Sequence, residues 1–424
     1  MSIEKLEPRL ANLIEDNRVR AERRGMALSA VEGQTFEVTI SHQDYVRAEE
    51  HEDRRAALNE LARRIEQAQA PIVAKLGEIG AEARIQALTN AVTTTLTPAQ
   101  LAQIAELDEV KIIRHERLDP VTTMNESPRL IEVFEAWEDF GATGRGIKVA
   151  VLDSGVDKNH PALSGKVVDE VSTAGEPVGM PGNHGTHVAG TIASNDPIYR
   201  GIAYQADLIN IKVLTAAGSG QPQSVIAGLE QAVRRGALVA NLSLGWSEFL
   251  HGWVCNDADC ILCQAADNAV RLGVTVVVAA GNEDSSAPAG KFNIRHPGAA
   301  RRVITVGAVD KAKVLANFSS IGPSSGRLST GSPARLTKPD LSGPGVGITS
   351  SVLGGGFAAF NGTSMASPHV AGVAALVLER NSGLRPRMVK KLLEDTCEPL
   401  PFAPNQVGYG LVNAYAALIR TVTK

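Results

Sequence analysis

The chain has 424 residues, a formal net charge of -4 and a hydrophobic content of 44%. Its length is about two to three times that of an average domain, so we expect one large domain and one smaller domain. The composition is that of a globular protein and excludes collagen-like, disordered and disulfide-stapled chains. There are 42 Lys and Arg against 46 Asp and Glu, and only 4% of residues are aromatic, so we expect no nucleic-acid partner.

The cellular location is predicted from targeting signals and cysteine use. Residues 1–9 carry charges and no apolar segment followed by a cleavage site, so no secretion signal is predicted. The most apolar run, 274–280, is too short for a bilayer, which takes about 20 residues, and is typical of a buried strand. Three of the 4 cysteines lie in one segment, which suits a reducing compartment. We therefore expect a cytoplasmic protein without a membrane span.

Residues 1–34 differ from the rest of the chain in their density of charge. Apolar positions between residues 6 and 24 recur at helical spacing, and Gly25 ends the pattern. We expect a charged helical leader. It is interpreted either as a solubilising helix or as a docking element.

Residues 35–124 are predicted to form a small α+β domain of ferredoxin-like βαββαβ order. Its second helix has Thr97 as the N-cap, Pro98 at the first helical position and Gln100 able to bond back to the cap. The predicted elements are a strand at 36–40, a helix at 56–69, one or two strands within 83–96, the helix after Thr97 and a strand at 110–114.

Residues 125–424 alternate short apolar runs with helical stretches, beginning with a helix at 128–140. Continuous apolar strands separated by helices predict an α/β fold, a parallel sheet with helices on both faces. In such sheets ligands bind at the carboxyl ends of the strands. The runs predicted to be strands are 147–152, 208–213, 238–242, 274–279 and 303–309.

Three polar segments fall at these strand ends or at helix starts. Asp153 follows an apolar strand, where a carboxylate leaving the core needs a cationic or hydrogen-bonding partner. His184 begins a helix whose glycine and alanine residues permit close packing. Ser364 opens another helix, whose dipole favours a developing anion. A carboxylate, a histidine and a serine are together the parts of a nucleophilic hydrolase.

In this order, the three segments resemble the subtilisin-type serine proteases, and the resemblance covers residues 128–420. It implies a serine endopeptidase in which Asp153 orients the imidazole, His184 is the general base and then the acid, and Ser364 is the nucleophile. His187, one turn further along the helix, is expected to be structural. The motifs are Ala150-Val-Leu-Asp-Ser-Gly, Asn183-His-Gly-Thr-His-Val-Ala-Gly and Gly362-Thr-Ser-Met-Ala-Ser-Pro.

The same resemblance assigns the groups that bind the oxyanion and the substrate. Asn282 matches the oxyanion side chain, and the amide of Ser364 is the second donor. The segment Ser243-Leu244-Gly245 matches the strand that pairs with an extended protein or peptide substrate. The P1 side chain would lie between this segment and Ala279-Ala280-Gly281, whose small walls favour a sizeable, mostly apolar residue.

A βαββαβ unit directly before a subtilisin-like domain resembles the inhibitory propeptide of that family. The resemblance implies a zymogen whose small domain inhibits the active site, assists folding and is cut from the enzyme by the enzyme itself. Val121 and Met124 place apolar residues at P4 and P1, so the predicted cut is the bond between Met124 and Asn125. Cuts after Thr122 or Thr123 are the alternatives.

Many members of this family bind calcium through an acidic residue soon after the catalytic aspartate and a long loop after the histidine helix. Here Ala162 stands at the acidic place and the loop 194–201 is short, so this calcium site is predicted to be lost. Asp157 is another candidate ligand, although a carboxylate at such a place is more often just solvated. We expect no required cofactor.

Cys255, Cys260 and Cys263 have the spacing Cys-x4-Cys-x2-Cys, with His251 nearby. These four groups are candidate zinc ligands, although the spacing is not one of the strong zinc-finger patterns. A disulfide between two of the cysteines is a second interpretation. The third interpretation, that the thiols are inert, is the favoured one.

The favoured interpretation places a helix at the end of this segment. Asp257 or Asp259 would cap a helix that runs to Leu272, with Cys263 in its apolar face. The segment directly follows the predicted substrate strand, so an influence on specificity is a further hypothesis.

Two other functions compete with that of a broad protease. The first is a catalytically silent relative that acts as a binding or chaperone module. Competent residues at all four catalytic positions argue against it, namely Asp153, His184, Ser364 and Asn282. The second is a processing protease of narrow specificity, held latent by its prodomain. Hydrolysis that depends on Ser364 would exclude the silent relative. Broad cutting of a casein mixture would exclude the processing protease of narrow specificity.

Overall fold

The computed structural model describes residues 35–42, 54–86, 91–115, 126–246, 260–283, 293–324 and 336–422. The chain divides into two compact units between Pro120 and Val121. The predicted leader at 1–34 and the predicted cut between Met124 and Asn125 lie outside the described residues.

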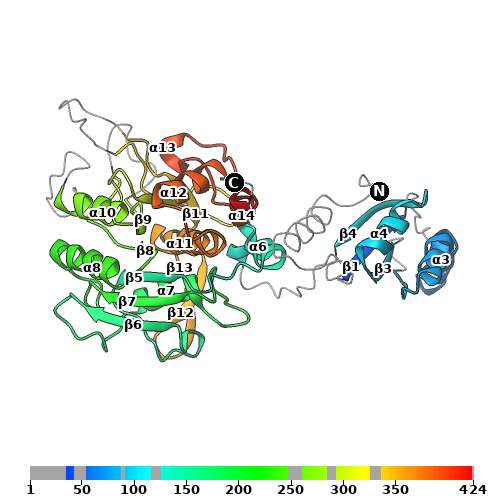
Figure 1. The fold of residues 1–424 in the computed structure, drawn as a ribbon, viewed down its shortest axis with the longest axis horizontal. Helices are drawn as coiled ribbons and strands as arrows, with labels where there is room; N and C mark the ends of the chain where they lie inside the picture. The colour runs from blue at the N-terminus through cyan, green and yellow to red at the C-terminus, as the bar shows by residue number, and fades with distance from the viewer. Residues whose placement is uncertain are drawn as a thin grey trace. The chain divides into compact units, whose positions relative to one another are not determined.

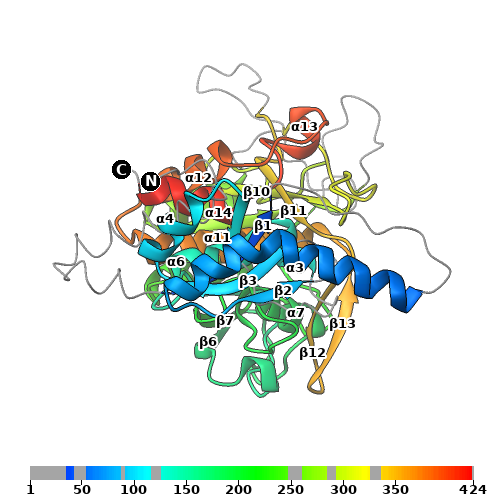
Figure 2. The same ribbon diagram turned by 90° about the vertical axis from the view of Figure 1, so that its right-hand side faces the viewer.

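The smaller unit contains a four-stranded antiparallel sheet with strand order β2-β3-β1-β4. The element order β1-α3-β2-β3-α4-β4 is the order that the sequence predicts. Val38 and Ile40 of β1 pack with Ile72 of α3 and Leu101 of α4 in one core, and Figure 2 shows α3 beside β2 and β3. The bounds are β1 Phe36–His42, α3 Arg54–Glu78, β2 Arg84–Gln86, β3 Ala91–Leu96, α4 Pro98–Ala105 and β4 Val110–His115.

The two helices of this unit differ in how well the sequence predicts them. Helix α4 has the predicted capping box, with the Thr97 side chain accepting from the Gln100 amide and the Gln100 side chain accepting from the Thr97 amide. Helix α3 continues past the predicted end at residue 69, although Pro71 lies inside the helix. The fully buried Leu76 extends its apolar face by two turns.

The larger unit is built on a seven-stranded sheet with strand order β11-β10-β9-β8-β5-β7-β6. Every neighbouring pair of strands is parallel, which confirms the predicted α/β fold. The bounds are β5 Lys148–Asp153, β6 Val167–Ser172, β7 Asp207–Lys212, β8 Val239–Leu242, β9 Thr275–Ala279, β10 Ile304–Val309 and β11 Leu341–Pro344.

Helices cover both faces of this sheet (Figure 1). Successive residues of β5 point to opposite faces, so Val149 and Val151 belong to one core while Ala150 and Leu152 belong to the other. This double burial is why the strands are continuous apolar runs in the sequence. The first core is covered by α6 Val133–Phe140, α7 Asn183–Ala193, α11 Thr363–Arg380 and α14 Ala414–Val422, and the second by α8 Pro222–Arg234 and α10 Ile261–Arg271.

Several elements differ from those predicted. The single helix expected at 128–140 is two helices, because Glu132 between them has a left-handed backbone with φ 54°. Strands β6 and β11 are additional to the predicted ones, as is an antiparallel hairpin of β12 and β13. The remaining elements are α5 Glu126–Leu130, the 3₁₀-helix η2 Pro161–Leu163, β12 Ile348–Val352, β13 Gly356–Phe360, α12 Pro386–Asp395 and α13 Pro404–Val407.

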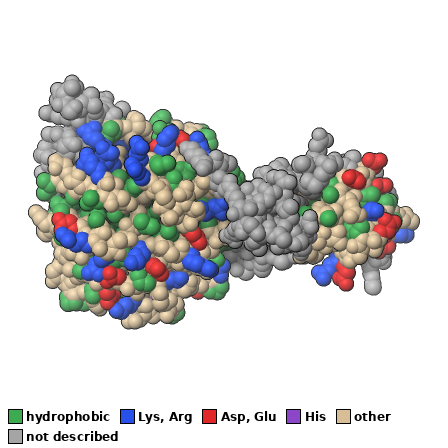
Figure 3. Space-filling model, in the orientation of Figure 1, with side chains coloured by type: hydrophobic (Ala, Val, Ile, Leu, Met, Phe, Trp, Pro, Cys, Tyr) green, Lys and Arg blue, Asp and Glu red, His purple; other side chains and the backbone are tan. Residues whose placement is uncertain are grey.

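The surface of the larger unit carries charges of both signs. Figure 3 shows Lys and Arg side chains interspersed with Asp and Glu over its visible face, with a group of Lys and Arg near the top of the view. Within the described ranges, no helix combines the length and the apolar character needed to cross a membrane.

Candidate active site

The candidate site lies at the carboxyl ends of three neighbouring strands, β5, β8 and β9. Asp153 is the last residue of β5, Ser243 directly follows β8, and Asn282 is the third residue after β9. The chain leaves β5 toward β7 and β6 on one side of the sheet and later returns to β8 on the other side. A crevice at the carboxyl edge of such a switch in strand order is the usual ligand site of an open α/β sheet.

Asp153 and His184 form a close pair. Nδ1 of His184 lies 2.8 Å from Oδ1 and 3.0 Å from Oδ2 of Asp153. Asp153 is buried, and its Oδ1 also accepts a 2.7 Å hydrogen bond from the Ser154 amide. The buried carboxylate at the end of the apolar strand therefore has the hydrogen-bonding partners that burial of a charge requires.

Glycines on each side of His184 explain why α7 starts at this place. A Cβ atom on Gly182 would lie 2.2 Å from Oγ of Ser154, and one on Gly185 would lie 2.4 Å from the carbonyl oxygen of Gly155. Both distances are far inside van der Waals contact, so only glycine lets the helix start approach the end of β5. The imidazole is thereby placed beside the carboxylate.

The electrostatics of this pair favour a protonatable imidazole. Burial lowers the pKa of His184, but the charge and hydrogen bond of Asp153 outweigh burial, so the pKa is raised above its ordinary value. With the Nδ1 proton donated to the carboxylate, Nε2 is the nitrogen that can accept a proton. The arrangement therefore suits a general base whose protonated form is stabilised.

Ser364 is the second residue of α11. Its hydroxyl donates a 3.1 Å hydrogen bond to the carbonyl oxygen of Ser243, and the hydroxyl of Ser243 donates back to the carbonyl oxygen of Ser364 over 2.7 Å. In the described residues the Ser364 hydroxyl makes this bond and not one to His184. Catalytic hydrogen bonds are often formed only when substrate is bound, so this rotamer is compatible with a nucleophile.

Asn282 is held by Thr363, a residue to which the sequence analysis gave no role. Oδ1 of Asn282 accepts a 2.9 Å hydrogen bond from the amide of Thr363 and a 3.0 Å hydrogen bond from its hydroxyl. Because these bonds fix Oδ1, the Nδ2 donor points elsewhere. A Cβ atom on Gly362 would lie 3.3 Å from this Nδ2 and 3.6 Å from the amide nitrogen of Ser364. The glycine thus leaves open the space that both predicted oxyanion donors border.

Arg295 lies against both glycines of the predicted substrate walls. A Cβ atom on Gly245 would be 2.7 Å from Cβ of Arg295, and one on Gly281 would be 2.8 Å from its Cγ. The guanidinium of Arg295 pairs with Glu283, whose other carboxylate oxygen accepts from Ser320. Sequence reasoning missed Arg295 because it belongs to no catalytic motif.

The other residues of the predicted substrate walls lie at the ends of β8 and β9. Leu244 is buried beside Ser243, and Ala279 and Ala280 are buried at the end of β9. The hydroxyl of Ser243 also lies 2.8 Å from the hydroxyl of Ser367. The segment after β8 is therefore hydrogen-bonded to two serines of α11, Ser364 and Ser367.

Two further histidines near the site are structural in their contacts. Nε2 of His187 contacts the carbonyl oxygens of Ile348 and Ala358, and its ring stacks on Phe360 with centroids 4.4 Å apart. Burial lowers the pKa of His187 to about 4, and it does the same for His369. Both rings are therefore neutral at pH 7, as the structural role predicted for His187 requires.

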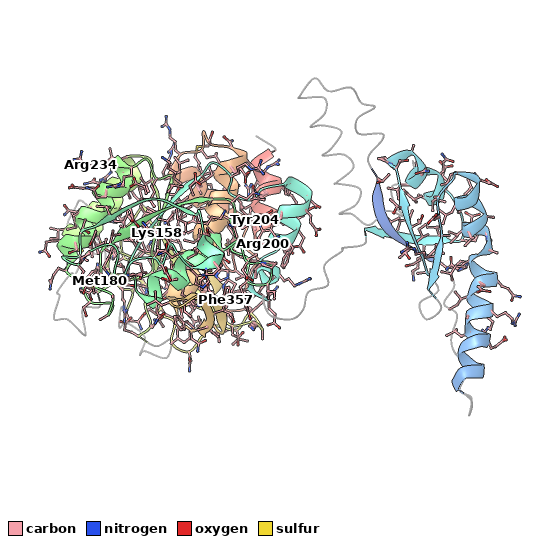
Figure 4. The ribbon with its side chains drawn as sticks, turned by 90° about the horizontal axis from the view of Figure 1, so that it is seen from below. Lys158, Met180, Arg200, Tyr204, Arg234 and Phe357 are labelled. Carbon is pink, nitrogen blue, oxygen red and sulfur yellow. The ribbon has the colours of Figure 1, made fainter. Side chains whose placement is uncertain are left out.

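The region predicted to lack a calcium site is held by other contacts. The carboxylate of Asp196 accepts hydrogen bonds from the amides of Ile198 and Tyr199. The Tyr199 ring lies 4.4 Å from that of Phe357. Arg200 lies 4.8 Å over the ring of Tyr204, a neighbour that Figure 4 shows beside it.

The three-cysteine segment is only partly described, because Cys255, His251, Asp257 and Asp259 lie outside the described residues. The predicted capping of its helix by Asp257 or Asp259 is wrong, since Cys260 is the N-cap of α10 and its sulfur accepts from the Cys263 amide. A sulfur can take this place because an N-cap needs an acceptor for a free amide. Cys263 is buried in the core, as predicted.

Comparison with known proteins identifies the class. Residues 144–410 match the subtilase family, so the chain belongs to this family and is a serine endopeptidase that acts on proteins or peptides. It is 40% identical to alkaline elastase YaB of Bacillus sp. (strain YaB) over 303 residues, which cover 70% of this chain and 71% of that protein.

Two further relatives agree with this assignment. Subtilisin Savinase of Lederbergia lenta is 41% identical over 280 residues, which cover 65% of this chain and 92% of that protein. The crystal structure of a cold-adapted subtilisin-like serine proteinase matches with a TM-score of 0.50 and 31% identity, over 64% of this chain and 88% of that chain. The predicted subtilisin-like fold and endopeptidase class are thereby confirmed.

Proposed function

We propose that this endopeptidase hydrolyses peptide bonds through Asp153, His184 and Ser364. Nε2 of His184 takes the proton of the Ser364 hydroxyl as its oxygen attacks the scissile carbonyl carbon. Asp153 stabilises the imidazolium, which then gives its proton to the leaving amine. Water hydrolyses the acyl-enzyme by the same steps in reverse order. The observation that carries this mechanism is the 2.8 Å contact between buried Asp153 and His184.

Two donors would stabilise the tetrahedral intermediates. Nδ2 of Asn282 and the amide of Ser364 border one space beside Gly362. Donors that are fixed before the reaction stabilise the oxyanion without reorganisation. Thr363 supplies that fixation here by holding Oδ1 of Asn282.

We propose that the substrate lies extended along Ser243-Leu244-Gly245, with its P1 side chain between this segment and Ala279-Ala280-Gly281. The side chain of Arg295 then forms part of the P1 wall, since its stem touches both Gly245 and Gly281. Charge at this wall is balanced, because Arg295 pairs with Glu283.

We propose that the chain is a zymogen and that its smaller unit is an inhibitory propeptide, removed by a cut between Met124 and Asn125. Support comes from the βαββαβ order of this unit and from its place directly before a subtilase domain. Cysteine use supports the proposed cytoplasmic location, because three of the 4 cysteines lie in one segment and do not form a stapling framework. Latency until processing would protect the other proteins of that compartment.

The test is the intact mass of purified wild type and Ser364→Ala over time, with parallel turnover of an apolar-P1 peptide. Ser219→Ala is the matched control, since Ser219 is an exposed residue outside the helices and strands. We expect wild type and Ser219→Ala to split near Met124 and to cleave the peptide, while Ser364→Ala stays whole and inactive. Cleavage of peptide by purified Ser364→Ala would overturn the nucleophile. A wild type that cleaves peptide while remaining whole would overturn self-processing alone.

A further inference from the structure

Three metal-binding side chains meet at the start of α10, a helix that packs on the face of the sheet opposite to the face covered by α7. Nδ1 of His296 lies 3.1 Å from Sγ of Cys263 and 3.6 Å from Sγ of Cys260. The two sulfurs and this nitrogen all lie within 4.8 Å of one another. Cys263 and His296 are buried and Cys260 is half-buried. In the described part of the chain this is the single such cluster of His, Cys, Asp or Glu.

We propose that Cys260, Cys263 and His296 bind one zinc ion, which fixes the wall of the substrate site. Zinc takes sulfur at about 2.3 Å and nitrogen at about 2.0–2.1 Å, so two such ligands of a tetrahedral ion are about 3.5 Å apart. The observed distances from His296 to the two sulfurs bracket this value. The histidine of this cluster, His296, comes from the connection between β9 and β10, whereas the candidate His251 lies outside the described residues.

The local structure makes the Cys260 sulfur an acceptor. Cys260 is the N-cap of α10, and its sulfur accepts a hydrogen bond from the amide of Cys263. Two thiolates and one Zn²⁺ sum to zero charge, so the buried cluster carries no net charge when the metal is bound.

The donor set selects among metals. Thiolate ligands are soft and disfavour Mg²⁺ and Ca²⁺, while two thiolates and an imidazole suit tetrahedral Zn²⁺. Water or a further protein group completes the fourth position of such a site.

The proposed ligand His296 is tied to both walls of the substrate site. Its amide and carbonyl exchange 3.0 Å hydrogen bonds with Trp246, the residue after Gly245. The neighbouring Arg295 amide donates to the carbonyl oxygen of Ala280 over 2.8 Å. A metal that holds His296 to α10 therefore braces the segment Arg295-His296, which is hydrogen-bonded next to both walls. This consequence, unlike the metal site itself, rests on the proposed function.

The metal site is tested in the full-length Ser364→Ala protein, where self-digestion is absent. Zinc content is measured after purification under reducing conditions without a chelator. The metal is then stripped, and Zn²⁺ is titrated back against a chromophoric chelator. We expect one zinc per chain, and Co²⁺ in its place should give the near-ultraviolet thiolate-to-cobalt charge-transfer band. Absence of saturable binding of both metals overturns the proposal without any variant.

Variants identify the ligands. Cys263→Ser and His296→Asn should each weaken zinc binding by at least about 10-fold. A loss of this size is expected even for a residue that only hydrogen-bonds to a metal ligand. Cys397→Ser is the matched control, because this thiol lies in another region and donates to the carbonyl oxygen of Leu393. Zinc binding that survives both ligand substitutions overturns the site, as does a disulfide between Cys260 and Cys263 in the native protein.

Bracing of the substrate site is measured separately in the active enzyme. Stripping zinc should raise KM for peptides more than it lowers kcat, and added Zn²⁺ should restore KM. If kcat and KM are the same in the zinc-bound and the zinc-free enzyme, the bracing is overturned, while the metal site itself still stands. An inactive enzyme that still binds zinc would count against the proposed function and not against the metal.

Discussion

The imidazole of His184 receives its orientation from a buried carboxylate, with Nδ1 2.8 Å from Oδ1 of Asp153. The glycines around His184 and the end of β5 let these two side chains meet. Removing the charge of Asp153 therefore acts directly on the base.

Asp153→Asn should lower kcat by about 10⁴-fold, as in other proteases of this chemistry, because the imidazole loses both its orientation and its counter-charge. His184 must be neutral to accept a proton, and Asp153 raises its pKa, so activity should rise with pH through a value above that of an ordinary histidine. In the variant this limb should move to lower pH. The pH dependence of kcat/KM measures it, with Asp157→Asn as the control, and an unmoved limb would contradict the account.

Asn282→Ala should lower kcat by about 100- to 1,000-fold with little change in KM, the magnitude known for loss of this donor in subtilisin-type enzymes. The donor acts on the oxyanion and not on the bound substrate. Thr363→Val should have a smaller effect of the same kind, because it removes the hydroxyl's hydrogen bond to Oδ1 of Asn282 but keeps the bond from the amide. Steady-state kinetics on one peptide compare the two. A rise in KM at constant kcat would show that Asn282 binds the ground state.

Arg295→Ala should increase kcat/KM for peptides with a large apolar P1 residue relative to those with P1 alanine. The substitution removes a stem that touches both Gly245 and Gly281. The preference is measured on matched peptides that differ at P1 alone. Because the change leaves Glu283 without its partner, Arg295→Met, which keeps the stem but not the charge, is the control. Equal preference in wild type and Arg295→Ala would remove Arg295 from the P1 wall.

Asp340→Asn should destabilise the larger unit by about 3–5 kcal/mol, because it breaks a buried ion pair on one side. Asp340 pairs with Lys338 and Lys390, each at 2.7 Å, and burial lowers the pKa of Lys338 to about 8. Urea unfolding in the Ser364→Ala background measures the loss. Asp395→Asn, which breaks the surface pairs with Lys391 and Arg420, should cost less than about 1 kcal/mol. Equal losses in the two variants would contradict the buried pair.

Much of this site can be predicted from the sequence because parallel strands end at one edge of the sheet. The motif positions Asp153 and Asn282 follow strands whose apolar runs are continuous, so their placement at one edge follows from the fold class. The glycines beside His184 are needed locally, because a Cβ atom at Gly182 or Gly185 would clash with the chain at the end of β5.

Other parts of the site depend on contacts that no local pattern encodes. Arg295 and His296 belong to the connection between β9 and β10, whose course is set by pairing with Trp246 and Ala280. Hydrophobic periodicity contains no signal for such a pairing. The break at Glu132 is similar, since a left-handed residue between two apolar helical stretches leaves their spacing intact. Within the smaller unit, burial of Leu76 outweighs the helix-ending signal of Pro71.

The central claim is that Ser364 is the nucleophile activated by His184. The most direct measurement is labelling of the active enzyme with a fluorophosphonate, followed by peptide mapping of the adduct. We predict one adduct per chain on Ser364, loss of activity in proportion to labelling, and much slower labelling of His184→Ala. An adduct on another serine, or full activity in an enzyme labelled at Ser364, would contradict it.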